Sequence, residues 1–192
     1  MTTTPTQAPG AVAPTEASLQ VQTTILEDQP TEEQLQARGF TTRCEFETDF
    51  PSNLLSGTMF VSVSEADEPF QTTQIIESNE TWLIDLVWFL RGQVVPLISG
   101  REWRVKIFME SLGRDSLDLE IPLRVPTNPN HFYHVQLRVP PNFVRPEPFN
   151  GTPYEINVVT VLLANNGRTS PIIGFCSLDP ILFFAEEIEV SP

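Results

Sequence analysis

This sequence has few of the residues that carry enzyme chemistry. Its 192 residues include two cysteines, two histidines, nine glycines and a single lysine, Lys106. Neither a GxxxxGK nor a GxGxxG phosphate loop occurs, which argues against nucleotide-dependent catalysis. No Gly-x-Ser-x-Gly elbow occurs, so the sequence does not predict a serine hydrolase. We therefore expect a protein that is not an enzyme and that uses no cofactor.

Positive charge and long apolar runs are also scarce. The chain has 11 Lys and Arg against 25 Asp and Glu, which gives a formal net charge of −14. Nucleic acid phosphates bind basic surfaces, and a membrane-spanning helix needs about 20 apolar residues. We expect a soluble, acidic chain that neither binds nucleic acid nor inserts into a membrane. The N-terminus lacks the pattern of a signal peptide, so a cytoplasmic location is the default expectation.

Residues 1–39 are rich in Thr and Pro and contain few large apolar side chains. Such a composition buries too little apolar surface to offset the entropy of ordering, so it predicts a flexible acidic arm with a disordered N-terminus. Within it, Thr31 precedes Gln34 by three residues, which is the spacing of a capping box, and Gly39 ends the pattern. We expect a short helix near 31–38.

From residue 40 onward, apolar and polar residues alternate with the period of β-strands. Residues 81–91 are apolar on both faces, which predicts a central strand whose second face is partly covered. Pro122 interrupts the alternating segment 117–125 and indicates an edge or bulged strand, because proline cannot donate to a ladder. Residues 154–163 are also apolar on both faces and are expected in the middle of a sheet.

About eight or nine strands are expected between residues 40 and 185, with connections too short for crossover helices. This pattern predicts an all-β domain, an antiparallel Greek-key β-sandwich of immunoglobulin-like or jelly-roll connectivity. Residues 186–192 are expected to form an acidic tail.

The cysteines and histidines give no clear site. Cys44 and Cys176 could bridge the edges of a sandwich, but one pair is not a disulfide framework, so free buried thiols are favoured. His131 and His134 are three residues apart at the start of a strand, which places them on opposite faces. We therefore expect no metal site.

Tryptophans and paired carboxylates suggest carbohydrate chemistry as an alternative. Trp82, Trp88 and Trp103 could form a sugar-stacking platform, but their alternation favours core positions. A glycosidase needs two carboxylates facing one cleft, and adjacent acids such as Glu186 and Glu187 more often serve solubility.

Rigid apolar loops and the closing segment are the best candidates for contact with a partner. Residues 140–149 contain four prolines beside apolar side chains, and rigid loops lose little entropy on docking. Residues 179–184 could cover an edge of their own domain or extend a neighbour's sheet. The candidate partner-binding residues are Phe143, Val144, Phe149, Ile181, Phe183 and Phe184.

These observations favour a non-enzymatic protein-binding or assembly module, possibly a structural subunit and homo-oligomer, whose partners are other protein chains, including copies of itself. A carbohydrate-binding or carbohydrate-cleaving β-sandwich is the first alternative. A jelly-roll shell subunit is the second, although the acidic arm does not suit a shell that packages nucleic acid.

Overall fold

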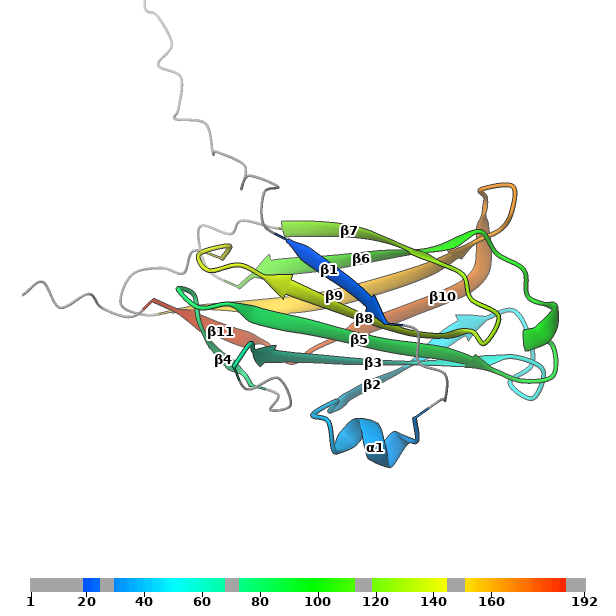
Figure 1. The fold of residues 1–192 in the computed structure, drawn as a ribbon, viewed down its shortest axis with the longest axis horizontal. Helices are drawn as coiled ribbons and strands as arrows, with labels where there is room; N and C mark the ends of the chain where they lie inside the picture. Colours follow the sequence, from blue (N-terminus) through cyan, green and yellow to red (C-terminus); the bar gives the residue numbers. More distant parts are fainter. Residues whose placement is uncertain (1–18, 25–29, 68–72, 113–118, 145–150, 186–192) are drawn as a thin grey trace, which may run out of the picture.

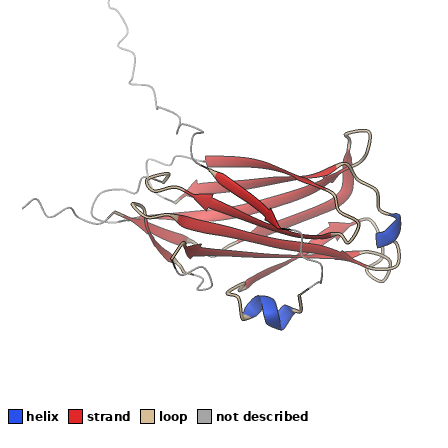
Figure 2. Cartoon of the chain, in the orientation of Figure 1, coloured by secondary structure: helices blue, strands red, loops and turns tan. Residues whose placement is uncertain are grey.

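Strands dominate the chain in the computed structural model, which describes residues 19–24, 30–67, 73–112, 119–144 and 151–185. Helix is confined to two short segments among these residues (Figure 2). The strands are β1 (Gln20–Thr24), β2 (Thr42–Thr48), β3 (Ser56–Glu65), β4 (Ile75–Glu77), β5 (Trp82–Arg91), β6 (Glu102–Ser111), β7 (Leu119–Pro126), β8 (Phe132–Val139), β9 (Thr152–Leu163), β10 (Thr169–Ser177) and β11 (Ile181–Phe184). The helices are α1 (Glu32–Gln36) and the 3-10 helix η1 (Val95–Leu97).

The strands form two layers of a β-sandwich (Figure 1). Sheet A has the order β1-β8-β5-β3-β2, and sheet B has the order β2-β10-β9-β6-β7. Strand β11 also pairs with β9, and β4 pairs with β11. Strand β2 belongs to both layers, since its first half pairs with β3 and its second half with β10.

The connections follow the predicted Greek-key pattern. The chain leaves sheet A after β5, forms the antiparallel hairpin β6–β7 in sheet B, and returns as β8 beside β5. The β11–β4 pairing is parallel, and the other strand pairs in the described residues are antiparallel. The prediction of an all-β, antiparallel sandwich is thus confirmed; the described part of residues 40–185 contains ten strands in place of the expected eight or nine, and β1 precedes them.

The inward faces of the two sheets pack on a central aromatic cluster. Trp88 of β5 and Tyr133 of β8 are stacked, with ring centroids 4.9 Å apart. Trp103 of β6 contacts both rings edge-on from the opposite sheet. Both tryptophans are fully buried, and aromatic pairs of this kind add about 0.5–1.5 kcal/mol beyond the area they bury. The cluster therefore joins the layers at their centre.

The second face of β5 is covered by α1, as its two-sided pattern predicted. Leu35 of α1 and Phe40 are buried against Val87 and Phe89 of β5, in a small cluster on the outer face of sheet A. The capping box indicated by the sequence starts the helix. Gly39 then adopts a φ of 81°, which lets the amide of Phe40 bond back to the Leu35 carbonyl and places the phenyl ring under the helix.

One part of the expected arm is a strand. Gln20–Thr24 pairs antiparallel with β8 as the edge of sheet A, whereas the sequence predicted that the flexible arm is disordered before its short helix. Val21 is the single large apolar residue of this segment, so its periodicity was too weak to reveal a strand that is held mainly by backbone bonds. The rest of the arm before residue 19, and the acidic tail 186–192, lie outside the described residues.

The edges and ends of the sheets agree with other sequence signals. Strand β7, which contains Pro122, pairs only with β6 among the described strands and forms an edge. Strand β9 lies in the middle of sheet B, between β10 and β6. None of the helices in the described ranges is both long and apolar enough to span a membrane.

The preference for free thiols is wrong, because Cys44 and Cys176 form a disulfide with a Cα–Cα distance of 5.5 Å. Pairing of β2 with β10 continues from Phe46 opposite Gly174 toward the two cysteines, so the strand register itself brings the sulfurs together. Sequence alone could not supply that register. The bond fixes β2 to β10 where β2 passes from one sheet to the other.

Replacing both cysteines by alanine should destabilise the domain. The bond closes a loop with a sequence separation of 132 residues, and in the chain-entropy account loops of this size are stabilised by about 3 to 5 kcal/mol. Urea unfolding should show a lower midpoint for the double variant Cys44→Ala/Cys176→Ala. A reductant should lower the midpoint of the natural protein and leave that of the variant unchanged; equal midpoints for oxidised and reduced protein would contradict this role.

Candidate functional site

A partly enclosed depression lies on the outer face of sheet A, beside α1. Its volume is about 300 Å³. We call it the α1 groove. The lining residues are Leu35, Arg38, Phe40, Ala66, Leu83, Asp85, Val87, His134, Gln136 and Arg138.

The groove arises because α1 covers only part of the outer face. Leu35 and Phe40 fill the space above Val87, and the strands continue beyond the end of the helix. There Asp85 lies opposite Gln136, and Leu83 lies opposite Arg138, on the neighbouring strands β5 and β8. The lining therefore combines apolar side chains, which we call the apolar wall, with hydrogen-bonding side chains, which we call the polar wall.

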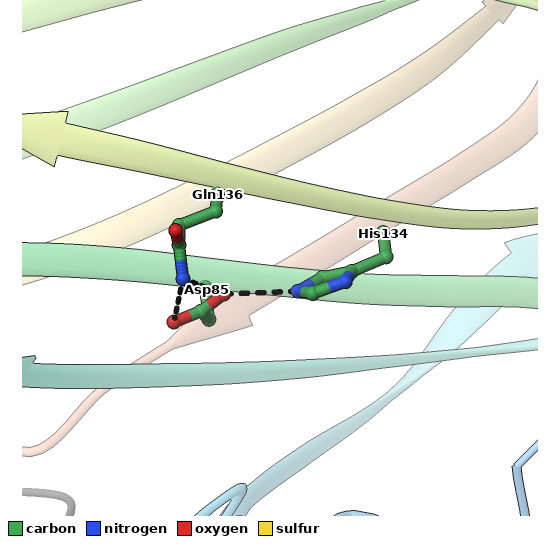
Figure 3. Close-up of polar contacts among 3 residues, drawn as sticks. All are labelled: Asp85, His134 and Gln136. Carbon is green, nitrogen blue, oxygen red and sulfur yellow. Dashed lines mark hydrogen bonds and ion pairs between the residues drawn. The ribbon is translucent and has the colours of Figure 1, made fainter. Parts of the chain in front are cut away.

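A buried carboxylate is the centre of the polar wall (Figure 3). Asp85 is 5% exposed. Its Oδ1 lies 2.9 Å from Nε2 of His134 and accepts a hydrogen bond of 3.2 Å from the amide nitrogen of Gln136, which is also 3.3 Å from Oδ2. A carboxylate can accept about four hydrogen bonds, so Asp85 is held in place and retains capacity for a further donor.

Two exposed arginines, Arg38 and Arg138, also line the groove. Neither forms an ion pair with a carboxylate among the described residues, whereas Arg43, which does not line it, is paired with both Glu32 and Glu45. Since the chain has only 11 basic residues against 25 acidic ones, these two guanidinium groups bring an unusual concentration of positive charge to the groove, beside the Asp85 carboxylate.

A second, shallower depression adjoins the groove and shares Ala66 and Arg138 with it. This depression has a volume of about 510 Å³ and a rim that includes Asp67 and Glu80. Burial raises the pKa of the neighbouring Glu65, and the charges of Asp67 and Glu80 raise it further. Arg138 thus stands between the groove and an acidic surface.

The groove offers both hydrogen-bonding and apolar side chains to a bound molecule. Asp85 and His134 resemble two members of a catalytic triad, but the residues that line the groove include no serine, threonine or cysteine to act as a nucleophile. In the part of the chain that the structure describes, no three His, Cys, Asp or Glu side chains come together as metal ligands. The chemistry that the groove offers is a buried acceptor, several donors and apolar contact.

The two histidines occupy different environments. His134 points into the groove, whereas His131 is buried at the end of the sandwich with a φ of 48°. Nε2 of His131 lies 3.2 Å from the carbonyl oxygen of Ile98, and Nδ1 lies 3.4 Å from the hydroxyl of Tyr133. Burial lowers the pKa of His131 below its usual 6.5, and the hydrogen bond to Ile98 opposes this only in part. The arrangement fits a neutral imidazole.

This burial predicts a loss of stability in acid. Between the lowered pKa of folded His131 and about 6.5, the unfolded chain binds more protons, so the free energy of unfolding falls as the pH drops through that window. His131→Asn removes the titrating group and keeps a side chain that tolerates positive φ. Urea unfolding of both proteins between about pH 8 and pH 5 should show the natural protein losing stability relative to the variant. A difference that does not change with pH would contradict the neutral assignment.

Most of the expected partner-binding residues fill the core. Val144, Ile181 and Phe183 are fully buried, and Phe143 packs partly against the same core. Phe184 is half-buried in β11, which pairs with β9 and β4 within its own domain. These side chains do not form an exposed patch. Phe149 lies outside the described residues.

The features that suggested carbohydrate chemistry have a structural role where they are described. Trp82, Trp88 and Trp103 are each 1% exposed or less, so they form core contacts and no sugar-stacking platform, as their alternation indicated. The acidic pair Glu186 and Glu187 lies outside the described residues.

The α1 groove itself was missed by sequence reasoning. Asp85 was the available signal, because a lone carboxylate in a strand that is otherwise apolar on both faces needs buried hydrogen-bond partners. His134 and Gln136 of β8 supply those partners, and they follow Asp85 by 49 and 51 residues in the chain. Only the pairing of β5 with β8 brings these three residues together.

The described residues form an antiparallel β-sandwich with a concave polar site, the α1 groove, on the outer face of sheet A. No protein-family model matches the sequence, and no curated protein matches it. Among solved structures, the fold is similar to a carbohydrate-binding module of family 9 from Caldicellulosiruptor kristjanssonii, determined in complex with cellotriose. The identity is 9%, the match covers 88% of this chain and 93% of that chain, and the TM-score is 0.36.

Proposed function

We propose that this protein is a non-enzymatic binding module that holds a carbohydrate-type ligand in the α1 groove. The observation that carries the proposal is the meeting of the buried Asp85 acceptor with exposed arginine donors and an apolar wall in one concave site. Ligand sites in proteins are typically concave and partly apolar, with a few convergent polar groups.

A sugar suits this mixture of groups. Its hydroxyls both donate and accept hydrogen bonds, so they can pair with Asp85 and with Gln136, while its C–H faces can lie against Leu83. A volume of about 300 Å³ is at the small end of ligand sites and suits one or two sugar rings. Because Arg38 and Arg138 lack carboxylate partners among the described residues, a sugar that carries a carboxylate should bind better than a neutral one.

Binding should depend on the two arginines. Titration calorimetry with oligosaccharides of neutral sugars and of uronic acids should detect the acidic ones more strongly. Arg38→Ala and Arg138→Ala should each weaken that binding by roughly tenfold or more, which is the effect of losing a hydrogen bond to a charged group. Both side chains are exposed, so neither substitution should disturb folding.

The matched control is Arg168→Ala, which removes an exposed arginine in the hairpin between β9 and β10. Its affinity should equal that of the natural protein. If all three substitutions weakened sugar binding equally, the effect would come from the net charge of the protein and not from the groove. No measurable binding of any sugar in the panel would overturn the carbohydrate proposal.

The disulfide favours an oxidising compartment over the cytoplasm. Structural disulfides persist in secreted and periplasmic proteins and are rare in the reducing cytosol. The Cys44–Cys176 bond therefore supports a location different from the default expected from the sequence. A disulfide-bonded protein in such a compartment agrees with the proposed binding of saccharides outside the cytoplasm.

Binding of another protein chain, the leading hypothesis from the sequence, is a second candidate function. It is supported by an exposed apolar area on the outer face of sheet B, which lies apart from the α1 groove. The jelly-roll shell alternative gains no support from the described residues.

A further inference from the structure

The outer face of sheet B has an apolar centre where an exposed sheet usually carries polar residues. Phe175 of β10 lies opposite Val159 of β9, and Ile173 lies opposite Val161 on the same two strands. Phe175 is 53% exposed, and the other three side chains are half-buried. Two adjacent rows of the sheet thus present apolar side chains outward, a pattern that marks contact surfaces. We call these four residues the β9–β10 patch.

Charges of opposite sign flank this patch on its two sides. On the β2 side, Glu47 lies opposite Ile173. On the β6 side, Arg104 lies opposite Val161 and Lys106 lies opposite Val159. One row of the sheet therefore reads Glu47, Ile173, Val161, Arg104 across four neighbouring strands.

The two flanking charges of this row are available for an external partner. Both Glu47 and Arg104 are exposed, and neither forms an ion pair with another described residue, in contrast to Lys106, which is paired with Glu120 at 2.6 Å. Nothing in the described fold thus requires the charge of Glu47 or of Arg104.

We propose that the β9–β10 patch is the interface of a homodimer, in which the outer faces of two sheets B pack against each other. The arrangement of charges is self-complementary about a two-fold axis that runs parallel to the strands, between β9 and β10. This axis sets Ile173 of one copy on Val161 of the other. It also sets Glu47 of each copy against Arg104 of its partner, so apolar meets apolar and acid meets base.

The dimensions of the face agree with this arrangement. Neighbouring strands are about 4.8 Å apart, so Glu47 and Arg104 lie on strands separated by about 14 Å, on either side of the axis. Sheets that pack face to face keep their strands within about 30° of one another, which preserves the match of the rows. A face of four to five strands is at the low end of stable interfaces, so dimerisation should depend on concentration over the micromolar range.

Sedimentation velocity across a concentration series tests the proposal directly. The natural protein should shift from monomer to dimer. Phe175→Glu, which places a charge at the centre of the patch, should weaken the dimer by roughly thirty-fold or more, as expected for a central contact. The matched control is Leu97→Glu, which changes a leucine that is 79% exposed in η1, in the connection between β5 and β6. It should leave the dimer unchanged.

Reversing the charge of Glu47 or of Arg104 tests whether these two residues meet across the two-fold axis. Glu47→Lys alone and Arg104→Glu alone each place like charges together in a homodimer and should weaken it by roughly tenfold. A mixture of the two single variants should form a heterodimer preferentially, because every pair across the axis is then of opposite sign. The double variant Glu47→Lys/Arg104→Glu should form a homodimer as strong as that of the natural protein, for the same reason.

A natural protein that stays monomeric through the millimolar range would overturn the proposal and leave the patch to a different partner. A dimer that ignores Phe175→Glu and both charge reversals would place the interface elsewhere. Because the α1 groove is on the opposite sheet, sugar binding should be the same for Phe175→Glu and the natural protein. A result that contradicts the dimer can therefore be told apart from a result that contradicts sugar binding in the α1 groove.

Discussion

The two-sided apolar character of β5 is the constraint on which the rest of the structure depends. One face of the strand meets sheet B through Trp88, and the other presents Val87 and Phe89 outward. Sheet A alone would leave that second face in water. The chain solves this with Leu35 and Phe40, which bring α1 onto the outer face. Because the helix spans only five residues, it covers part of the strand and leaves the α1 groove beyond its end.

The same constraint explains the position of the buried carboxylate. Asp85 lies on the outward face of β5, two residues from Val87, where the cover of α1 ends. Burial without partners would cost several kcal/mol, and the register of β8 supplies His134 and Gln136 at hydrogen-bond distance. The polar wall of the groove is thus needed for the stability of β5, whether or not the groove binds a ligand.

Local patterns in the sequence predicted those parts of the fold that local patterns determine. The period of two identified the strands, the doubled apolar faces of residues 81–91 and 154–163 identified central strands, and Pro122 identified an edge. The capping box at Thr31 identified the helix.

The sequence could not predict what depends on register between distant strands. The Cys44–Cys176 bond, the contact of Asp85 with His134, and the rows of the β9–β10 patch each join residues that are far apart in the chain. Strand β1 was missed for another reason, since its stability comes from pairing with β8 and hardly from its own apolar residues. Nearly all of the candidate site depends in this way on the register between distant strands.

The order in which the chain is synthesised gives the disulfide a further consequence. Strand β2 takes its place in sheet B only when β10 exists to receive it, and Cys176 follows Cys44 by 132 residues. Until β10 has left the ribosome, the second half of β2 has no neighbour, and sheet B remains open beside β9. The domain therefore closes late, after nearly all of its strands have emerged, and a chain that stops before β10 lacks the strand through which β2 joins sheet B.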